Sequence, residues 1–531
     1  MNRRLLSIVI FITIASLAVF PRISRITTLP PSLFSDEVDA GYQALTFNQN
    51  HADYFGNRFP VHFQSFSDWR TSLYIYSVAA VQNFTSSPEL SVRLPSAIFG
   101  ILSVAVFYLL TNSVFAAFLL AISPWAIHYS RTGFEVSGMI FCLLTGIYFW
   151  QKHQQKHQTI YLIASIISLS LSAYFYSTAK LFIVFLIPLC YLIWKPKLKS
   201  LIISLFIGLL VLTPLAVDTL KGRAGYRFSY ISIFTEPHRE QITDTLRYQD
   251  ILLEHPDEIG VPTPPLSFLF HNKYQLIVER FVKNYIYSFS PEFLFLEGDK
   301  NLRQGFGQHG MFYIIDFFMI LYGLYLYLKK PTKLGHLFFW VLILGPIPFA
   351  LTRDSLGPHA TRLIIILPSL IYFSSLTLSK IPLITPFYLL LLINFWHYYQ
   401  NHYPQLSART WHTNLKEAVL ATSKYPDHQI YFSDTAEPFL PFFLYYYPFL
   451  PHEPLTSHLT ELNTNYFSGK CLDNRYCFGQ INLNAFPSTT TPTLFVIPTS
   501  QSVTIPNGFT LKQTLPKKFQ EGEAFQIFSN L

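Results

Sequence analysis

Charged residues are scarce in this chain of 531 residues, of which 13% are Asp, Glu, Lys or Arg and 50% are hydrophobic. A soluble domain usually carries about twice that share of charge. Apolar runs of about 17 to 25 residues recur along the chain, and this is the length that crosses a bilayer. The net charge of +8 is explained by lysines in short loops between these runs, so the composition argues against nucleic acid as a partner.

Cysteine is also scarce, and the four cysteines form no CxxC pair and no metal-binding pattern. Cys142 and Cys190 lie inside apolar runs. Cys471 and Cys477 lie in a polar C-terminal region, where a disulfide is expected if that region is outside the cytoplasm, and two unpaired thiols are the alternative. The sequence therefore predicts no cofactor and no metal site.

The apolar runs predict about eleven membrane-spanning helices. The first run follows Arg3 and Arg4 and precedes no small-residue cleavage site, so we expect an uncleaved anchor rather than a signal peptide. The predicted spans are 5–20, 92–110, 114–128, 134–150, 160–176, 181–194, 201–217, 312–328, 337–351, 361–378 and 383–396.

Loop charges orient these helices. The loops expected in the cytoplasm, at 151–156, 195–199 and 329–333 and around Lys380, carry lysine and no carboxylate. This bias follows the positive-inside rule and places the N-terminus in the cytoplasm of a multi-pass protein of the plasma membrane. The opposite face receives Asp36, Glu37, Asp39, Asp53, Asp68, Glu89, Glu135, Asp218, Glu297, Asp299 and Asp354.

Long segments without a span complete the organisation. Residues 22–90 and 219–310 are expected as outer loops, and within the second the mixed apolar and basic stretch 274–289 predicts a helix in the membrane interface. Strand patterns at 429–433 and 493–497, with an aromatic-rich helix at 436–447, predict a small extracytoplasmic α/β domain. We thus expect a polytopic α-helical membrane domain over 1–400 and an α/β domain over 401–531.

An acidic pair, Asp36 and Glu37, directly follows the first predicted crossing. One interpretation is structural, since Ser35 can cap a helix whose first turn favours carboxylates. The other is catalytic: a carboxylate at the membrane surface can take a proton from a hydroxyl while being shielded from bulk water. Both interpretations can hold together.

Further charged residues stand at the predicted outer ends of several spans. Each has an ordinary explanation: a snorkelling side chain, an i,i+4 ion pair between Arg131 and Glu135, a solvated loop charge, or an interfacial anchor. Their convergence on one side from distant segments instead indicates a site for an anionic substrate. The candidates are Arg93, Arg131, Lys180, Asp299, His359 and Arg362.

The order of these segments resembles the polyprenyl-phosphate-sugar-dependent glycosyltransferases of the GT-C fold, near protein O-mannosyltransferases and lipid A aminoarabinose transferases. The segments that carry the resemblance, over about residues 1–400, are Ser35-Asp36-Glu37, Val92-Arg93-Leu94-Pro95-Ser96-Ala97, His128-Tyr129-Ser130-Arg131-Thr132-Gly133-Phe134-Glu135, Phe295-Leu296-Glu297-Gly298-Asp299-Lys300-Asn301 and Pro358-His359-Ala360-Thr361-Arg362.

The resemblance implies that the first-loop acid is Asp36, with Glu37 beside it. It places a second acid on Asp68, although Trp69-Arg70-Thr71 stands where protein mannosyltransferases often have His-Pro-Pro. It matches the family arginine to Arg93. Some relatives bind a metal, but no ligand set for one is evident in this sequence.

The function implied is transfer of a sugar from a polyprenyl-phosphate donor in the membrane lipid to an acceptor hydroxyl, with inversion and with Asp36 as general base. Arg93, Lys180 and Arg362 are then the candidates for the departing phosphate. The acceptor is left open between protein, lipid and glycan. The alternatives are a transporter or flippase of lipid-linked glycans and a non-enzymatic scaffold; a transporter would favour charges near the bilayer midplane and repeated halves, and the sequence has neither.

Overall fold

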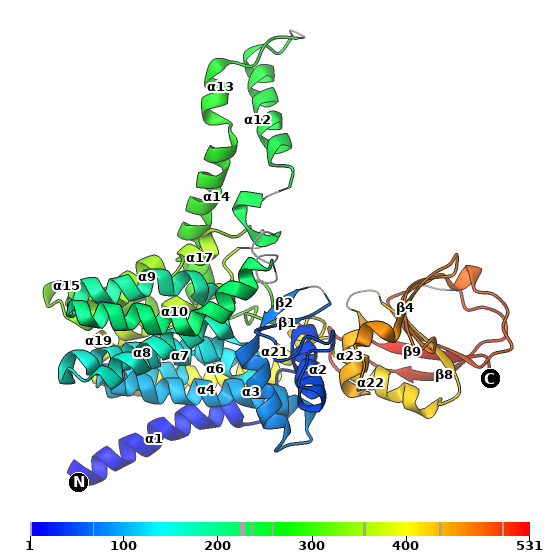
Figure 1. Ribbon diagram of the computed structural model, residues 1–531, viewed down its shortest axis with the longest axis horizontal. Coiled ribbons are helices and arrows are strands. Elements are labelled where there is room, and N and C mark those ends of the chain that lie inside the picture. Colours follow the sequence, from blue (N-terminus) through cyan, green and yellow to red (C-terminus); the bar gives the residue numbers. More distant parts are fainter. Residues whose placement is uncertain are drawn as a thin grey trace.

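We describe a computed structural model of the chain, which covers residues 3–531 except 67, 223–229, 236, 258–259, 354–356, 435–437, 448 and 502–503. Asp354, Ser67 and the first two residues of the helix expected at 436–447 lie outside the described residues. A bundle of helices forms the body of the molecule, and a β-sheet domain lies beyond one end of it (Figure 1).

Every predicted apolar run is helical. Among the described residues, five helical stretches are long and apolar enough to cross a membrane: α4 (Pro88–Thr111), α9 (Ser177–Trp194), α10 (Leu198–Leu220), Lys333–Ala350 and Ala360–Leu378. The last two contain breaks, giving α16 (Lys333–Leu344), α17 (Ile347–Ala350), α18 (Ala360–Leu363) and α19 (Leu367–Leu378). The predicted fold class, a multi-span helical membrane protein with a C-terminal sheet domain, is confirmed.

The other runs form shorter or broken helices. Apolar helical segments run from Ile8 to Ile23 within α1 (Arg3–Ile23) and over α8 (Thr159–Phe175). The run predicted at 114–128 is divided at Ser123, which caps the second piece. The other helices formed by the predicted apolar runs are α5 (Val114–Ile122), α6 (Pro124–Arg131), α7 (Val136–Lys156), α15 (Ile314–Lys329) and α20 (Thr385–Asn401).

The helix α7 has 21 residues, but its C-terminal end is polar, and α6 and α7 are long and apolar enough to cross a membrane only when taken together. The two helices are bent by 119° at the break between them. Among the described residues, fewer helices are both long and apolar enough to cross alone than the eleven runs predicted. Breaks within the runs, which hydropathy does not reveal, account for part of this difference.

The end of the bundle nearest the sheet domain carries a small layer of its own. It consists of α2 (Ser35–Asn50), the antiparallel strands β1 (His62–Gln64) and β2 (Trp69–Thr71), and α3 (Ser72–Gln82). The first turn of α2 is closed by the side chain of Glu37, whose Oε2 accepts from the N–H of Phe34 at 3.2 Å. This satisfies a backbone donor that a helix start leaves open.

Three helices form an arm that stands away from the bundle: α12 (Arg239–Glu254), α13 (Pro265–Phe270) and α14 (Lys273–Tyr287) (Figure 1). The helix predicted at 274–289 is thus present. Val278, Val282 and Ile286 follow one another at helical spacing, with 59%, 45% and 60% of their surface exposed. Its place in the membrane interface stays a prediction.

The C-terminal sheet has seven strands in the order β4-β5-β6-β3-β7-β9-β8. Among the strands that the structure describes in this sheet, only the pairings of β3 with β6 and β7 are parallel. The predicted strand at 429–433 is confirmed, and that at 493–497 extends by one residue. The strands are β3 (Gln429–Ser433), β4 (Leu459–Asn463), β5 (Phe467–Leu472), β6 (Tyr476–Ile481), β7 (Thr493–Pro498), β8 (Thr510–Leu515) and β9 (Phe525–Ser529).

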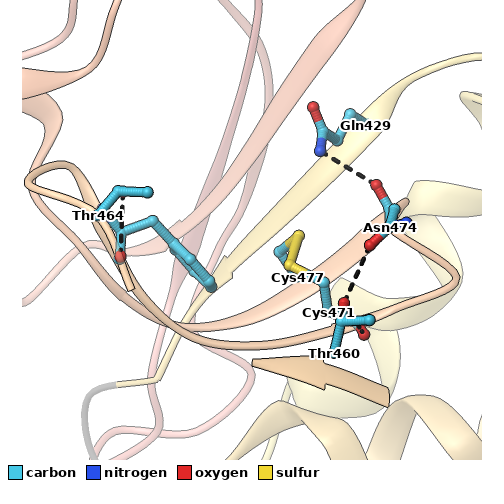
Figure 2. The surroundings of a disulfide bond; sticks show 7 residues. Gln429, Thr460, Thr464, Cys471, Asn474 and Cys477 are labelled. Carbon is cyan, nitrogen blue, oxygen red and sulfur yellow. Dashed lines mark hydrogen bonds between the residues drawn. A yellow bond between two sulfur atoms is a disulfide. The ribbon is translucent and has the colours of Figure 1, made fainter. Parts of the chain in front are cut away.

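Cys471 and Cys477 form a disulfide between the neighbouring strands β5 and β6, where the two residues are directly opposite. Figure 2 shows the bond beside the turn that joins these strands. Asn474 in this turn accepts from Thr460 Oγ1 at 3.0 Å and, through its carbonyl, from Gln429 Nε2 at 3.1 Å. The disulfide is therefore the alternative that the structure supports.

The helix α23 (Phe439–Tyr446) of the C-terminal region packs directly on α2. The ring of Tyr445 lies against Gly41, where an added Cβ would come within 2.4 Å of Tyr445 Cζ. Tyr445 donates to the carbonyl of Pro88 at 2.8 Å, and Tyr42 of α2 donates to the carbonyl of Phe449 at 2.6 Å. The helix that bears the acidic pair is thus held between the bundle and the sheet domain.

Candidate active site

The three carboxylates in the first turns of α2 have different surroundings. The side chain of Asp36 is 51% exposed. Glu37 is fully buried, and Asp39 is 5% exposed. Successive side chains on a helix point about 100° apart, so these acids point in different directions from α2. The packing of α2 on both sides buries Glu37 and Asp39 and leaves Asp36 at the surface.

Arg70 on β2 joins two of these acids. Its Nη2 lies 2.6 Å from Asp36 Oδ1 and its Nε lies 2.5 Å from Asp39 Oδ2. Burial alone would lower the pKa of Arg70, but the carboxylates of Asp36, Asp39 and Glu135 raise it well above its usual value. The guanidinium therefore remains charged, and it fixes the carboxylate of Asp36 relative to the hairpin.

Asp39 is held from several sides. Its Oδ1 accepts from Tyr54 Oη at 2.8 Å and from Ser65 Oγ at 3.2 Å. Burial raises its pKa, and the charge of Arg70 opposes that rise. Arg70 was not among the residues predicted for the site. The signal available was its position two residues after Asp68 in the acid-rich outer loop.

Glu37 and Arg93 form a fully buried ion pair. The Nε of Arg93 lies 3.0 Å from Glu37 Oε1, and its Nη2 lies 3.2 Å from Oε2. Glu37 Oε1 also accepts from the N–H of Gly133 at 2.6 Å. The remaining donors of Arg93 go to the carbonyls of Ile26, Pro30 and Ser32. All five N–H groups of this guanidinium are thus used within the protein.

Arg131 is similarly enclosed. It donates to the carbonyls of Pro21, Ser24 and Leu29, the latter two at 2.7 and 3.0 Å. Its guanidinium also stacks over the Trp396 ring, 5.1 Å from the centroid. The guanidiniums of Arg93 and Arg131 therefore bind the segment between α1 and α2 to the bundle.

Lys180 begins a chain of hydrogen bonds near the hairpin. Its Nζ lies 2.9 Å from His62 Nε2, and His62 Nδ1 lies 2.6 Å from Asp218 Oδ2. Burial, together with the charge of Lys180, lowers the pKa of His62 to about 4, against the opposing effects of Asp218 and Asp68. The predicted residues Lys180 and Asp68 thus lie in one cluster.

Asp299, His359 and Arg362 meet at the start of α18. The Oδ2 of Asp299 accepts from the N–H of Ala360 at 2.8 Å, so it caps this helix. Arg362 Nη1 donates to Thr352 Oγ1 at 2.9 Å. The sequence placed Asp299 in one outer segment and His359 and Arg362 together in another, and the structure brings the two segments together.

Two residues that were not predicted, Arg303 and His412, lie near the start of α2. The guanidinium of Arg303 lies over the ring of Phe34, 5.3 Å from its centroid. Burial, together with the charge of Arg303, lowers the pKa of His412 to about 3, against the opposing effect of Asp36. Arg303 ends the charged segment that contains Asp299, which could have drawn attention to it; His412 lies in no recognisable motif.

No cluster of three or more His, Cys, Asp or Glu side chains suited to a metal ion occurs among the described residues. The site as described is thus a set of carboxylates and cations. It can accept a proton from a neutral group and bind an anionic one.

The chain is similar to one protein family and to several solved structures. Residues 71–218 match the model of a family described as dolichyl-phosphate-mannose-protein mannosyltransferase. No curated protein matches the chain. Among solved structures, ArnT from Cupriavidus metallidurans in the apo state is 10% identical, covers 99% of this chain and 98% of its own, and has a TM-score of 0.45.

Two more structures are similar at this level. ArnT from Cupriavidus metallidurans bound to undecaprenyl phosphate is 10% identical over 99% of this chain and 98% of its own, with a TM-score of 0.42. The Archaeoglobus fulgidus oligosaccharyltransferase in complex with Zn and sulfate is 14% identical over 86% of this chain and 59% of its own, with a TM-score of 0.44. The family match confirms, over residues 71–218, the resemblance to lipid-phosphate-sugar-dependent glycosyltransferases that the sequence indicated, and with it the enzyme class.

Proposed function

We propose that this chain transfers a sugar from a polyprenyl-phosphate donor to an acceptor hydroxyl by direct displacement, with Asp36 as the general base. The observation that carries the proposal is the exposure of Asp36. Of the three acids in this part of α2, it alone presents an accessible carboxylate, at 51% exposure, while Glu37 and Asp39 are buried. A base must reach the hydroxyl that it deprotonates.

Glu37 takes a different role in this proposal. Both of its oxygens already accept hydrogen bonds from Arg93 and from backbone N–H groups. A proton accepted there would break a fully buried ion pair, which is costly. We therefore assign Glu37 to holding the first turn of α2 in place, and Arg70 to orienting the carboxylate of Asp36.

The departing lipid phosphate needs cations. Arg93 and Arg131 are engaged with buried acceptors, so we assign the phosphate to other cations: Lys180, Arg362 and the newly placed Arg303. Each is only partly buried. Preorganised positive groups stabilise the charge that develops on a leaving phosphate without later rearrangement.

The proposal places the site on the extracytoplasmic face. The lysine-rich loops on the other side of the bundle support this orientation. The disulfide between Cys471 and Cys477 supports it as well, because such bonds persist in oxidising compartments. The sheet domain would then lie outside the cytoplasm, next to the acceptor.

The test is Asp36→Asn, assayed in membranes for transfer of radiolabelled sugar from defined polyprenyl-phosphate sugars. Loss of a general base lowers the rate by about 10²- to 10⁴-fold, while insertion and melting temperature stay as in the unaltered protein. Asp244→Asn is the matched control, since Asp244 is another exposed aspartate paired with an arginine, at 3.3 Å from Arg247.

Full transfer by the Asp36→Asn variant would remove Asp36 as the base. A second outcome concerns the alternative function. If vesicles containing the unaltered protein moved lipid-linked glycan across the bilayer and transferred no sugar, the chain would be a flippase and the proposal would fail.

A further inference from the structure

Two consecutive hydrogen bonds join side chains from three distant parts of the chain, Asp218, His62 and Lys180. We call this hydrogen-bonded chain the relay, although it transfers no proton. Asp218 stands at the end of α10, His62 on β1 and Lys180 in the first turn of α9. The two links measure 2.6 Å, from Asp218 Oδ2 to His62 Nδ1, and 2.9 Å, from His62 Nε2 to Lys180 Nζ. The side chain of His62 is 1% exposed and that of Asp218 is 11% exposed.

The chemistry of the partners fixes the proton positions in this relay. The ammonium of Lys180 has donors and no acceptor, so His62 Nε2 must carry the lone pair. The proton of the neutral ring is then on Nδ1, from which it is donated to Asp218. The lowered pKa of His62, about 4, agrees with a neutral ring at ordinary pH. The ammonium of Lys180 is thus oriented by a neutral histidine.

The relay lies where two lipid-facing helices end. Val184 and Leu192 on α9 are 61% and 72% exposed, and Leu209 on α10 is 68% exposed. Exposed apolar side chains on a spanning helix face the acyl chains. A polyprenyl chain lying along this surface would bring its phosphate to the level of the helix ends, where Lys180 stands.

The register of the hairpin separates the relay from the acidic cluster. His62 is opposite Thr71, whereas Arg70 is opposite Phe63. Because successive side chains of a strand alternate, His62 and Arg70 leave the hairpin on different faces. The relay and Asp36 therefore approach from different sides, which suits a displacement in which the hydroxyl enters opposite to the departing phosphate.

We propose that Asp218 and His62 are positioning residues that hold the ammonium of Lys180 on the phosphate of the lipid-linked donor. The inference rests on the proposed function, because it assigns the donor phosphate to one side of the same site. His62 contributes no proton to the reaction. Asp218 fixes the ring, the ring fixes the ammonium, and the ammonium binds the phosphate.

The test compares two replacements of His62 in the full-length chain. The amide of His62→Gln reaches about as far as Nε2 and can accept from Lys180, whereas the amide of His62→Asn reaches only the place of Nδ1. We expect His62→Asn to bind undecaprenyl phosphate about tenfold more weakly, the size expected from one charge-assisted hydrogen bond. His62→Gln should retain most of the affinity. Undecaprenol, which has no phosphate, should bind all variants equally.

The control is His428→Asn, which removes a hydrogen-bonded histidine in the sheet domain, where His428 Nε2 lies 3.1 Å from Ser529 Oγ. In transfer assays His62→Asn should raise the KM for the lipid donor more than it lowers kcat. A purely structural histidine would instead lower the melting temperature and weaken binding of both lipids together, and this result would overturn the inference.

The inference and the proposed function fail in different ways. If the unaltered protein bound undecaprenyl phosphate no better than undecaprenol, the donor class would be wrong. If it preferred the phosphate and His62→Asn and His62→Gln kept that preference unchanged, the relay alone would be wrong.

Discussion

Replacement of Arg93 by lysine distinguishes a phosphate ligand from a structural anchor. Arg93 makes five hydrogen bonds, two to Glu37 and one each to the carbonyls of Ile26, Pro30 and Ser32. Lysine keeps the charge but has three donors, so at least two buried acceptors lose their partners. At roughly 1–3 kcal/mol for each, Arg93→Lys should lose about 2–6 kcal/mol of folding stability.

The assay is thermal unfolding of the detergent-solubilised full chain, combined with the KM for the lipid donor. We expect a clearly lower melting temperature and little change in KM for the fraction that remains folded. Arg58→Lys, at an exposed arginine, is the control and should melt as the unaltered protein does. A variant Arg93→Lys with normal melting and weakened donor binding would refute the anchor role and restore Arg93 as a phosphate ligand.

Two further predictions concern Arg70 and Asp434. Arg70→Gln leaves Asp39 buried without its cation, so this variant should lose about 3–5 kcal/mol of folding stability and should also lose sugar-transfer activity. Adding Asp39→Asn should restore the melting temperature but not the transfer activity. Recovery of both would show that Arg70 does not orient the base. Burial raises the pKa of Asp434 to about 7 from 3.8, against the N–H of Phe439. Between these two pH values the folded chain holds a proton that the unfolded chain has lost, so folding stability falls as pH rises from about 4 to about 7. The melting temperature of Asp434→Asn, measured across this window, should depend less on pH than that of the unaltered protein.

The helical character of the apolar runs was predictable because it depends on local composition. A run of apolar residues is visible in the sequence whatever it packs against, and each predicted run is helical. The breaks were less visible. Ser123 and Pro124 divide a run that is apolar on both sides, and the sequence alone gave no reason to prefer a break to a bend.

The roles of the charged residues were harder to predict, because they depend on distant partners. Nothing local distinguishes Arg93, which is enclosed by carbonyls from the segment before α2, from Lys180, which is only partly buried. Likewise Asp36 and Glu37 are adjacent in sequence, and only the packing of α2 decides which one is exposed. Arg70 lies on a strand of three residues, too short for a periodic pattern.

The packing of Tyr445 against Gly41 has a practical consequence for domain deletion. A protein shortened to its membrane part would lose the surface that holds one side of α2, together with the bond from Tyr42 to Phe449. Such a truncation would disturb the proposed base whatever the sheet domain itself binds. The two regions are better separated by substitutions on the sheet far from α23, which leave the support of α2 intact.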